Sequence, residues 1–287
     1  MSASSLEIIS EHACFGGVQR FYSHHSKEIG LPMRFSVFLP PQAQDGKVPA
    51  LIYLAGLTCT EETFMTKGGA QRIAAEQGMI LIAPDTSPRG ANVPGEADGW
   101  DFGLGAGFYV DATEAAWSKH YRMYSYVLEL LALVTESLPV EPSRVGITGH
   151  SMGGHGALVL ALRNPGLFKS VSAFAPICAP IQCPWGVKAF TGYLGSDQAT
   201  WRHYDATALM EQQATPYPNG ILIDQGLSDK FLPGQLFPEA FEAACAKAQQ
   251  PLELRRHAGY DHGYYFISTF VEDHLRFHHQ QLNGAAR

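Results

Sequence analysis

The feature that most constrains this chain is a G-x-S-x-G pattern at residues 149–153, with Ser151 at its centre. It follows an apolar run at 144–148, a predicted strand, and precedes a predicted helix at 152–163. A sharp strand-to-helix turn holds the serine in an unfavourable backbone conformation, and the flanking glycines remove side chains that would clash. The helix N-terminus beneath the serine favours a developing negative charge. The pattern therefore predicts that Ser151 is a nucleophile at the carboxyl edge of a sheet.

Short apolar runs alternate with helical stretches along most of the chain. Such runs are typical of strands buried on both faces of a parallel sheet, and we expect them at 48–54, 79–83, 144–148, 170–174 and 220–224. A late strand is expected at 252–257. Helices are predicted at 70–77, 121–138, 152–163, 237–249 and 264–281.

The first forty residues differ, because apolar side chains alternate at 31–39 as in a half-buried antiparallel strand. The sequence thus predicts an α/β class, with a mainly parallel central sheet flanked by helices and antiparallel N-terminal strands. One domain is expected over residues 1–287. Two segments, 85–120 and 175–206, are predicted to be long loops of functional or covering character.

Charge and composition exclude several classes of protein. Twenty Lys and Arg against 27 Asp and Glu give a net charge of −7, which disfavours binding to nucleic acid and to anionic membranes. No window reaches about 18 continuous apolar residues, so no membrane span is expected. The five cysteines form no C-x-x-C pair, and the N-terminus lacks the pattern of a secretory signal. A cytoplasmic protein with reduced thiols is the expectation.

A serine becomes nucleophilic when a base takes its proton, and in this type of fold the acid and then the histidine follow the serine along the chain. Two of the twelve histidines suit that order. His262 lies in a loop directly before the last predicted helix, whereas His257 ends a strand pattern. We expect His262 to be the base and keep His257 as the alternative.

The acid should follow the predicted strand at 220–224. Asp229 lies on that loop and could fix the histidine tautomer. Asp224 is within the strand, where it could be a buried polar residue, and Asp261 adjoins His262, so its side chain should diverge. One oxyanion donor is expected to be the N–H of Met152 and the other the N–H of Leu57, where Gly56 makes room.

Longer motifs surround these residues, at 54–60, 100–113, 120–126, 149–157 and 260–267. Through them nearly the whole chain resembles the S-formylglutathione hydrolase family, also called esterase D, of the α/β-hydrolase fold. The resemblance implies hydrolysis of a glutathione thioester to glutathione and formate. It implies Ser151, Asp229 and His262 as the catalytic residues, Leu57 and Met152 as oxyanion donors, and a possible homodimer. Neither a metal nor another cofactor is implied.

Residues around the pocket are expected from the same resemblance and from the chemistry of the substrate. The family places a cysteine near the active site, which corresponds to Cys59. The loop from Trp100 to Tyr109 could wall a small acyl pocket, and Trp185 could border a groove for glutathione. Because glutathione carries net negative charge, a cation could steer it; the candidates are Lys67, Arg89 and Lys188.

Two other functions remain compatible with the sequence. A general carboxylesterase or acyltransferase would use the same three catalytic residues, and relative rates on thioesters and oxygen esters separate it from a formyl thioesterase. A binding protein on a catalytically dead hydrolase fold is disfavoured because all three residues are present. A fluorophosphonate label that failed to attach to Ser151 would revive that third hypothesis.

Overall fold

The computed structural model describes residues 6–284, and nine strands within this range form one mixed sheet. Their order across the sheet is β1-β2-β3-β5-β4-β6-β7-β8-β9. The strands are β1 (Glu7–Cys14), β2 (Gly17–His25), β3 (Pro32–Leu39), β4 (Val48–Leu54), β5 (Ile80–Pro84), β6 (Val140–Gly149), β7 (Ser170–Phe174), β8 (Ile221–Gly226) and β9 (Leu252–His257).

The two halves of the sheet differ in strand direction, as the sequence predicts. Strands β1, β2 and β3 pair antiparallel to one another, and β3 also pairs antiparallel with β5. All remaining pairs, from β5 through β9, are parallel. Every residue of β4, β5, β7 and β8 is buried, which explains why their sequences are mainly apolar. The α/β-hydrolase-like fold is confirmed.

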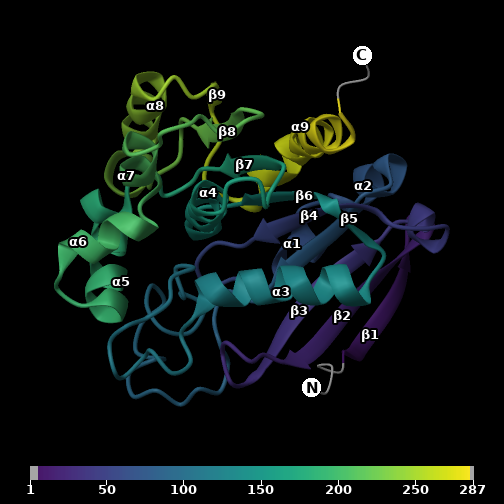
Figure 1. Cartoon of the computed structure of the whole chain (residues 1–287), viewed down its shortest axis with the longest axis horizontal. Helices are drawn as coiled ribbons and strands as arrows, with labels where there is room; N and C mark the ends of the chain where they lie inside the picture. The colour runs from purple at the N-terminus through teal and green to yellow at the C-terminus, as the bar shows by residue number, and fades with distance from the viewer. Residues whose placement is uncertain (1–5, 285–287) are drawn as a thin grey trace.

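Helices cover the sheet on both faces (Figure 1). They are α1 (Glu61–Lys67), α2 (Gln71–Gln77), α3 (Met123–Ser137), α4 (Met152–Arg163), α5 (Pro184–Leu194), α6 (Gln198–Trp201), α7 (Ala206–Glu211), α8 (Pro238–Lys247) and α9 (Tyr264–Asn283). Figure 1 shows α4 and α9 on either side of β7, with α7 and α8 beside β8 and β9 and with α5 and α6 farther out on the left. Short 3₁₀ or π turns lie at Pro41–Gln44, Pro180–Gln182, Arg202–Tyr204 and Leu232–Leu236.

The structure contains helices that the sequence did not predict, mainly in the segment at 175–206. The expected loop at 175–206 contains α5 and α6, so that prediction is wrong for much of its length. Helix α5 begins at Pro184, and the Cys183 sulfur accepts the Gly186 N–H as an N-cap. Its glycines and tryptophan obscure the helical pattern in the sequence. Helices α1 and α7 were also not predicted, whereas residues 85–120 are irregular, as expected.

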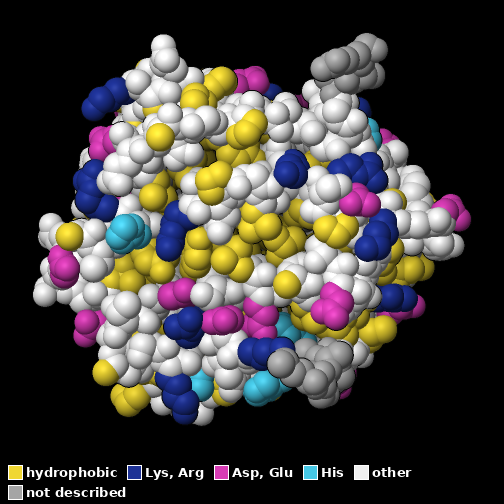
Figure 2. Space-filling view, viewed as in Figure 1, with side chains coloured by type: hydrophobic (Ala, Val, Ile, Leu, Met, Phe, Trp, Pro, Cys, Tyr) yellow, Lys and Arg dark blue, Asp and Glu magenta, His cyan; other side chains and the backbone are white. Residues whose placement is uncertain are grey.

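The surface seen in Figure 2 mixes both signs of charge. Lysine and arginine side chains are interspersed with acidic ones on this face, and apolar side chains gather across its middle. No continuous basic stripe is visible on it. Within residues 6–284, no helix is both long and apolar enough to cross a lipid bilayer.

Two wholly buried histidines are held as neutral rings by hydroxyl and carbonyl groups. The His155 Nε2 atom lies 2.9 Å from the Phe108 carbonyl, and burial lowers the pKa of His155 to about 4. The His278 ring lies 2.6 Å from the Ser170 hydroxyl, and burial lowers the pKa of His278 well below its usual range. Both rings bind protons more readily in the unfolded chain than in the folded one.

This difference predicts a loss of stability in acid. A lowered folded-state pKa leaves full stability above the unfolded pKa, near 6.5, and loses it as pH falls below that value. For His155 alone, with a folded pKa of about 4, the cost at pH 5 is roughly 2 kcal/mol. Thermal unfolding between pH 7.5 and 5 should show Tm falling, and His155→Gln should flatten the slope. The exposed His12, changed to Gln, is the control, and an equal flattening there would contradict this account.

Candidate active site

The turn between β6 and α4 has the strained geometry that its sequence predicts. Ser151 adopts φ +57° and ψ −117°, a region that side-chain-bearing residues rarely occupy. A Cβ on Gly153 would fall on the carbonyl oxygen of Leu54, so only glycine fits there. The Ser151 N–H donates to the Phe174 carbonyl at 3.0 Å, which ties the turn to the neighbouring strand β7. The serine is thereby fixed at the carboxyl edge of the sheet.

A cavity of about 220 Å³ opens beside Ser151. The residues that line it come from loops after several different strands. They are Gly56, Leu57, Thr58, Cys59, Trp100, His150, Ser151, Trp185, Phe231, His262 and Tyr264. The structure therefore brings together Ser151 and His262, which are far apart in the sequence.

His262 is paired with Asp229. Its Nδ1 atom lies 2.5 Å from the Asp229 Oδ2 atom, and the Asp229 side chain is fully buried. The other carboxylate oxygen of Asp229 accepts the Phe231 N–H at 2.8 Å. A hydrogen bond at Nδ1 fixes the tautomer and leaves Nε2 free for a proton from a serine hydroxyl. The geometry can thus support general-base chemistry in the cavity.

The alternative base and acids are occupied elsewhere. The His257 ring stacks on Phe270 at 3.8 Å, and its Nε2 atom lies 3.2 Å from an Asp224 oxygen. The Asp261 carboxylate accepts the N–H of Gly263 at 2.9 Å. None of these side chains lines the cavity beside Ser151.

A second Ser–His–Asp array lies under α9. The Ser172 Oγ atom lies 2.8 Å from His274 Nδ1 and 2.8 Å from His278 Nε2. His274 Nε2 in turn lies 3.3 Å from Asp224, which also receives two 2.6 Å hydrogen bonds from Arg255. Burial alone would raise the pKa of Asp224, but the His274 and Arg255 hydrogen bonds hold that pKa below its usual range.

The second array is too deeply buried to act as a reactive site. Ser172, Asp224 and His278 have no exposed surface, and His274 is 1% exposed. The Ser172 hydroxyl is also engaged by Thr148 at 2.8 Å. Since the serine has no exposed surface, no substrate carbonyl can approach it, and the array is a structural hydrogen-bond network. Among the described residues, no group of three His, Cys, Asp or Glu side chains could hold a metal ion.

The turn at residues 56–59 faces the serine. A Cβ on Gly56 would lie 3.2 Å from both the Ser151 Cβ and the His150 Nδ1 atoms, so a side chain there would crowd Ser151. Leu57 lines the cavity, and Met152 opens helix α4 directly after the serine. These are the positions from which two backbone N–H groups can meet a developing oxyanion.

The other residues expected at the pocket divide into two groups. Cys59, Trp100 and Trp185 line the cavity, and the two indoles meet edge to face at 5.5 Å. Burial raises the pKa of the Cys59 thiol, so it is largely protonated at neutral pH. Tyr109 does not line the cavity, contrary to expectation, because it is fully buried with its hydroxyl donating to the Ala55 carbonyl at 3.0 Å.

The three candidate cations lie in different settings. Lys188 pairs with Asp101 at 2.5 Å, and Arg89 pairs with Asp85 at 2.8 Å. Lys67 lines a separate cavity of about 440 Å³ with Tyr264, Tyr265 and Ser268. Tyr264 also lines the cavity beside Ser151, so the two cavities adjoin.

Four lining residues, Thr58, His150, Phe231 and Tyr264, were not anticipated from the sequence, although Thr58 falls within the motif at 54–60. The His150 ring lies 4.4 Å from the His262 ring, and burial lowers the pKa of His150 well below its usual range. Phe231 meets His262 edge to face at 5.0 Å. His150 and Tyr264 fall within the motifs at 149–157 and 260–267, so the sequence carried a signal for them. The sequence carried no signal for Phe231, because its contact with His262 depends on the path of the loop after β8.

Comparisons with known proteins agree with this geometry. The Esterase family model matches residues 26–277. The S-formylglutathione hydrolase of Rattus norvegicus is 56% identical over 97% of this chain and 99% of its own length. That of Paracoccus denitrificans is 52% identical over 96% of this chain and 98% of its own. A solved S-formylglutathione hydrolase from Agrobacterium tumefaciens superposes with a TM-score of 0.93 at 50% identity, covering 96% and 99% of the two chains.

The fold and the strained serine turn define an α/β-hydrolase of the Esterase family. More distant structures share the fold alone, such as a ferulic acid esterase at 21% identity and a TM-score of 0.67. Within the esterases, this chain belongs to the S-formylglutathione hydrolase family.

The two serines should respond differently to removal of their hydroxyl groups. Ser172→Ala removes one buried hydrogen-bond partner from each of His274, His278 and Thr148, so it should lower stability by about 1–3 kcal/mol. The rate per active site should stay within about twofold of the unmodified protein, because the array has no contact with the cavity. Denaturant unfolding and active-site-titrated kcat measure the two effects. Loss of turnover in a folded Ser172→Ala protein would contradict the structural assignment.

Proposed function

We propose that this protein hydrolyses S-formylglutathione to glutathione and formate, with Ser151 as nucleophile, His262 as base and Asp229 as the orienting acid. The observation that carries the proposal is the buried His262–Asp229 hydrogen bond, whose histidine lines one cavity with Ser151. The curated relatives that are more than half identical support the choice of substrate.

The mechanism follows from these positions. Ser151 Oγ attacks the formyl carbon while His262 Nε2 takes the hydroxyl proton. The N–H groups of Leu57 and Met152 stabilise the oxyanion. The carbon–sulfur bond then breaks, the glutathione sulfur takes the proton from His262 Nε2 and leaves as the thiol, and a formyl ester remains on Ser151 beside a neutral His262. Water, deprotonated by His262, attacks that ester and releases formate, which restores the serine hydroxyl.

The size of the cavity suits a small acyl group. At about 220 Å³ it is below the roughly 300–1,000 Å³ of common ligand sites, so a tripeptide must extend beyond it. Cys59, Trp100 and Trp185 border the acyl end in this proposal. The adjoining cavity of about 440 Å³ offers room for the peptide, and Lys67 supplies a cation that matches its net negative charge.

A general carboxylesterase or acyltransferase is the alternative function, since its chemistry would use the same residues. We further propose that residues 1–287 act as one domain, in the cytoplasm, and that two copies associate. The unpaired outer edge of β1, with Ile8 and Ile9 about half exposed, is available for such association. The molar mass in solution, measured by light scattering, tests the homodimer.

The decisive measurement compares kcat/KM on S-formylglutathione with that on p-nitrophenyl acetate. We expect the thioester to be preferred by about 100-fold or more, which corresponds to roughly 2.7 kcal/mol of transition-state stabilisation. Ser151→Ala should lose at least about 10,000-fold on both substrates. Comparable values on the two substrates would favour the general esterase, and full activity in Ser151→Ala would overturn the site assignment.

Lys67 should affect the peptide substrate more than a neutral ester. For Lys67→Met we expect the ratio of kcat/KM on S-formylglutathione to that on p-nitrophenyl acetate to fall by up to about fivefold at low salt, as for an exposed charge pair. The fall should shrink as ionic strength rises. Lys47→Met is the matched control. The exposed Lys47 directly precedes β4, at the end of that strand away from the cavity beside Ser151. An equal change in both variants would refute a role for Lys67.

A further inference from the structure

The turn that carries Leu57 is strained. Thr58 adopts φ +67°, a left-handed conformation that glycine or asparagine tolerates and a β-branched residue rarely adopts. The turn closes through a long 3.3 Å hydrogen bond from the Cys59 N–H to the Gly56 carbonyl. Such a conformation persists only where the surrounding structure holds it. The position of the Leu57 N–H therefore depends on contacts from outside the turn.

Those contacts come largely from the segment after β5. The Cys59 carbonyl accepts a 2.6 Å hydrogen bond from the Thr86 hydroxyl and a 3.3 Å hydrogen bond from Arg89 Nη2. On the other side, the Thr58 N–H donates to the Gly105 carbonyl at 2.9 Å. The strained turn is thus held at two successive residues.

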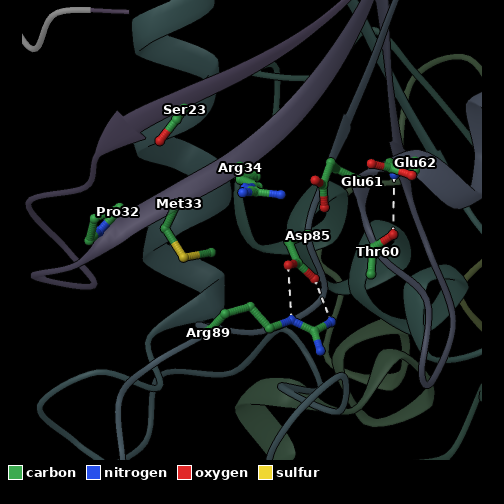
Figure 3. Close-up of a pocket in the computed structure, with 9 residues that line it drawn as sticks. All are labelled: Ser23, Pro32, Met33, Arg34, Thr60, Glu61, Glu62, Asp85 and Arg89. Atoms are coloured by element: carbon green, nitrogen blue, oxygen red, sulfur yellow. Dashed lines mark hydrogen bonds and ion pairs between the residues drawn. The ribbon is translucent and has the colours of Figure 1, made fainter. Parts of the chain in front are cut away.

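Arg89 is itself held in a fixed orientation. Its Nε and Nη2 atoms donate to the two carboxylate oxygens of Asp85 at 3.0 and 2.8 Å (Figure 3). Asp85 is only 3% exposed, and it also accepts the Thr86 N–H at 2.7 Å. Because the guanidinium is planar and bound at two points, the second N–H of Nη2 is held in one direction, toward a further acceptor. That acceptor is the Cys59 carbonyl.

We propose that Arg89 is a positioning residue for the oxyanion hole: by binding the Cys59 carbonyl, it holds the strained turn so that the Leu57 N–H faces Ser151. Arg89 does not line the cavity beside Ser151, so it acts through the turn and not on the substrate. The inference rests on the proposed function in one respect only, namely that the Leu57 N–H is a donor to the oxyanion. It applies equally to thioesters and oxygen esters.

The first test replaces Arg89 with Met and counts active sites with a fluorophosphonate. We expect kcat per titrated site to fall by about 10- to 100-fold on both substrates, with KM changed much less, because the oxyanion donor is displaced and not removed. Arg72→Met is the matched control, since Arg72 is exposed and pairs with Glu76 on α2. A merely structural role would lower Tm and the number of active sites but leave kcat per site unchanged, which would overturn the proposal.

Thr86→Val provides a second variant that keeps the shape of the side chain. It removes the other donor to the Cys59 carbonyl and should also lower kcat per site. Because both side chains bind one carbonyl, the effects of Thr86→Val and Arg89→Met should be non-additive in the double variant. Strictly additive losses would show that the two residues act separately and would count against a shared hold on the turn.

The surroundings of Arg89 allow chemical rescue. Its side chain lines a cavity of about 570 Å³, with Arg34, Glu61 and Asp85 among the other lining residues (Figure 3). Removal of the side chain in Arg89→Ala leaves an opening that methylguanidinium can enter. We expect added methylguanidinium, at concentrations far below those that denature, to restore kcat several-fold in Arg89→Ala, whereas methylammonium, which lacks the planar fork, does not. Equal effects of both cations would contradict the inference.

These outcomes are distinguishable from failure of the proposed function. If the unmodified protein does not hydrolyse S-formylglutathione, the proposed substrate is wrong, and the Arg89 variants are still measured on p-nitrophenyl acetate. If the unmodified protein is active on both substrates but Arg89→Met has normal kcat per site, the positioning role alone is wrong.

Discussion

The close contact between the Ser151 turn and β4 is the constraint on which the rest of the site depends. Gly153 lies so near the Leu54 carbonyl that no side chain fits between them, and Ser151 is held at φ +57° in consequence. Parallel pairing of β4 with β6 brings the two strands' carboxyl ends together at this contact. The same edge receives the loop after β8, which carries Asp229. A shift of one strand would therefore separate Ser151, the 56–59 turn and Asp229.

The sequence predicted those parts of the fold and site that depend on local patterns. Unbroken apolar runs indicated the parallel strands, and the glycines around Ser151 indicated the turn, because each signal reflects a steric requirement of nearby residues. Tyr109 shows where such reasoning fails. Its aromatic side chain suggested a pocket wall, but the hydroxyl reaches the Ala55 carbonyl from a fully buried position. Phe231 likewise reaches His262 only through the tertiary path of its loop.

Two Ser–His–Asp arrays in one chain show that residue identity does not define a catalytic site. Both arrays combine a serine, a histidine and a buried aspartate. In the first, His262 lies within hydrogen-bond distance of Asp229. In the second, His274 lies close to both Ser172 and Asp224. The array at Ser172 sits beneath α9 and has no exposed surface, so its hydroxyl has only protein partners. Ser151 instead lines a cavity beside a helix N-terminus. Access to a cavity, not the three side chains alone, therefore separates the array that we propose to be catalytic from the buried one.

The 56–59 turn is held by polar groups that do not themselves line the cavity beside Ser151. A left-handed Thr58 is unfavourable in isolation, so its conformation must be maintained by bonds formed elsewhere in the fold. The 85–89 segment supplies them from the end of β5, and Gly105 supplies another from the irregular loop at 85–120. That loop therefore has a definite role although it contains no helix or long strand. The Gly105 carbonyl and the Thr86 and Arg89 side chains hold the 56–59 turn in place without support from a substrate, as the oxyanion hole that we propose would require.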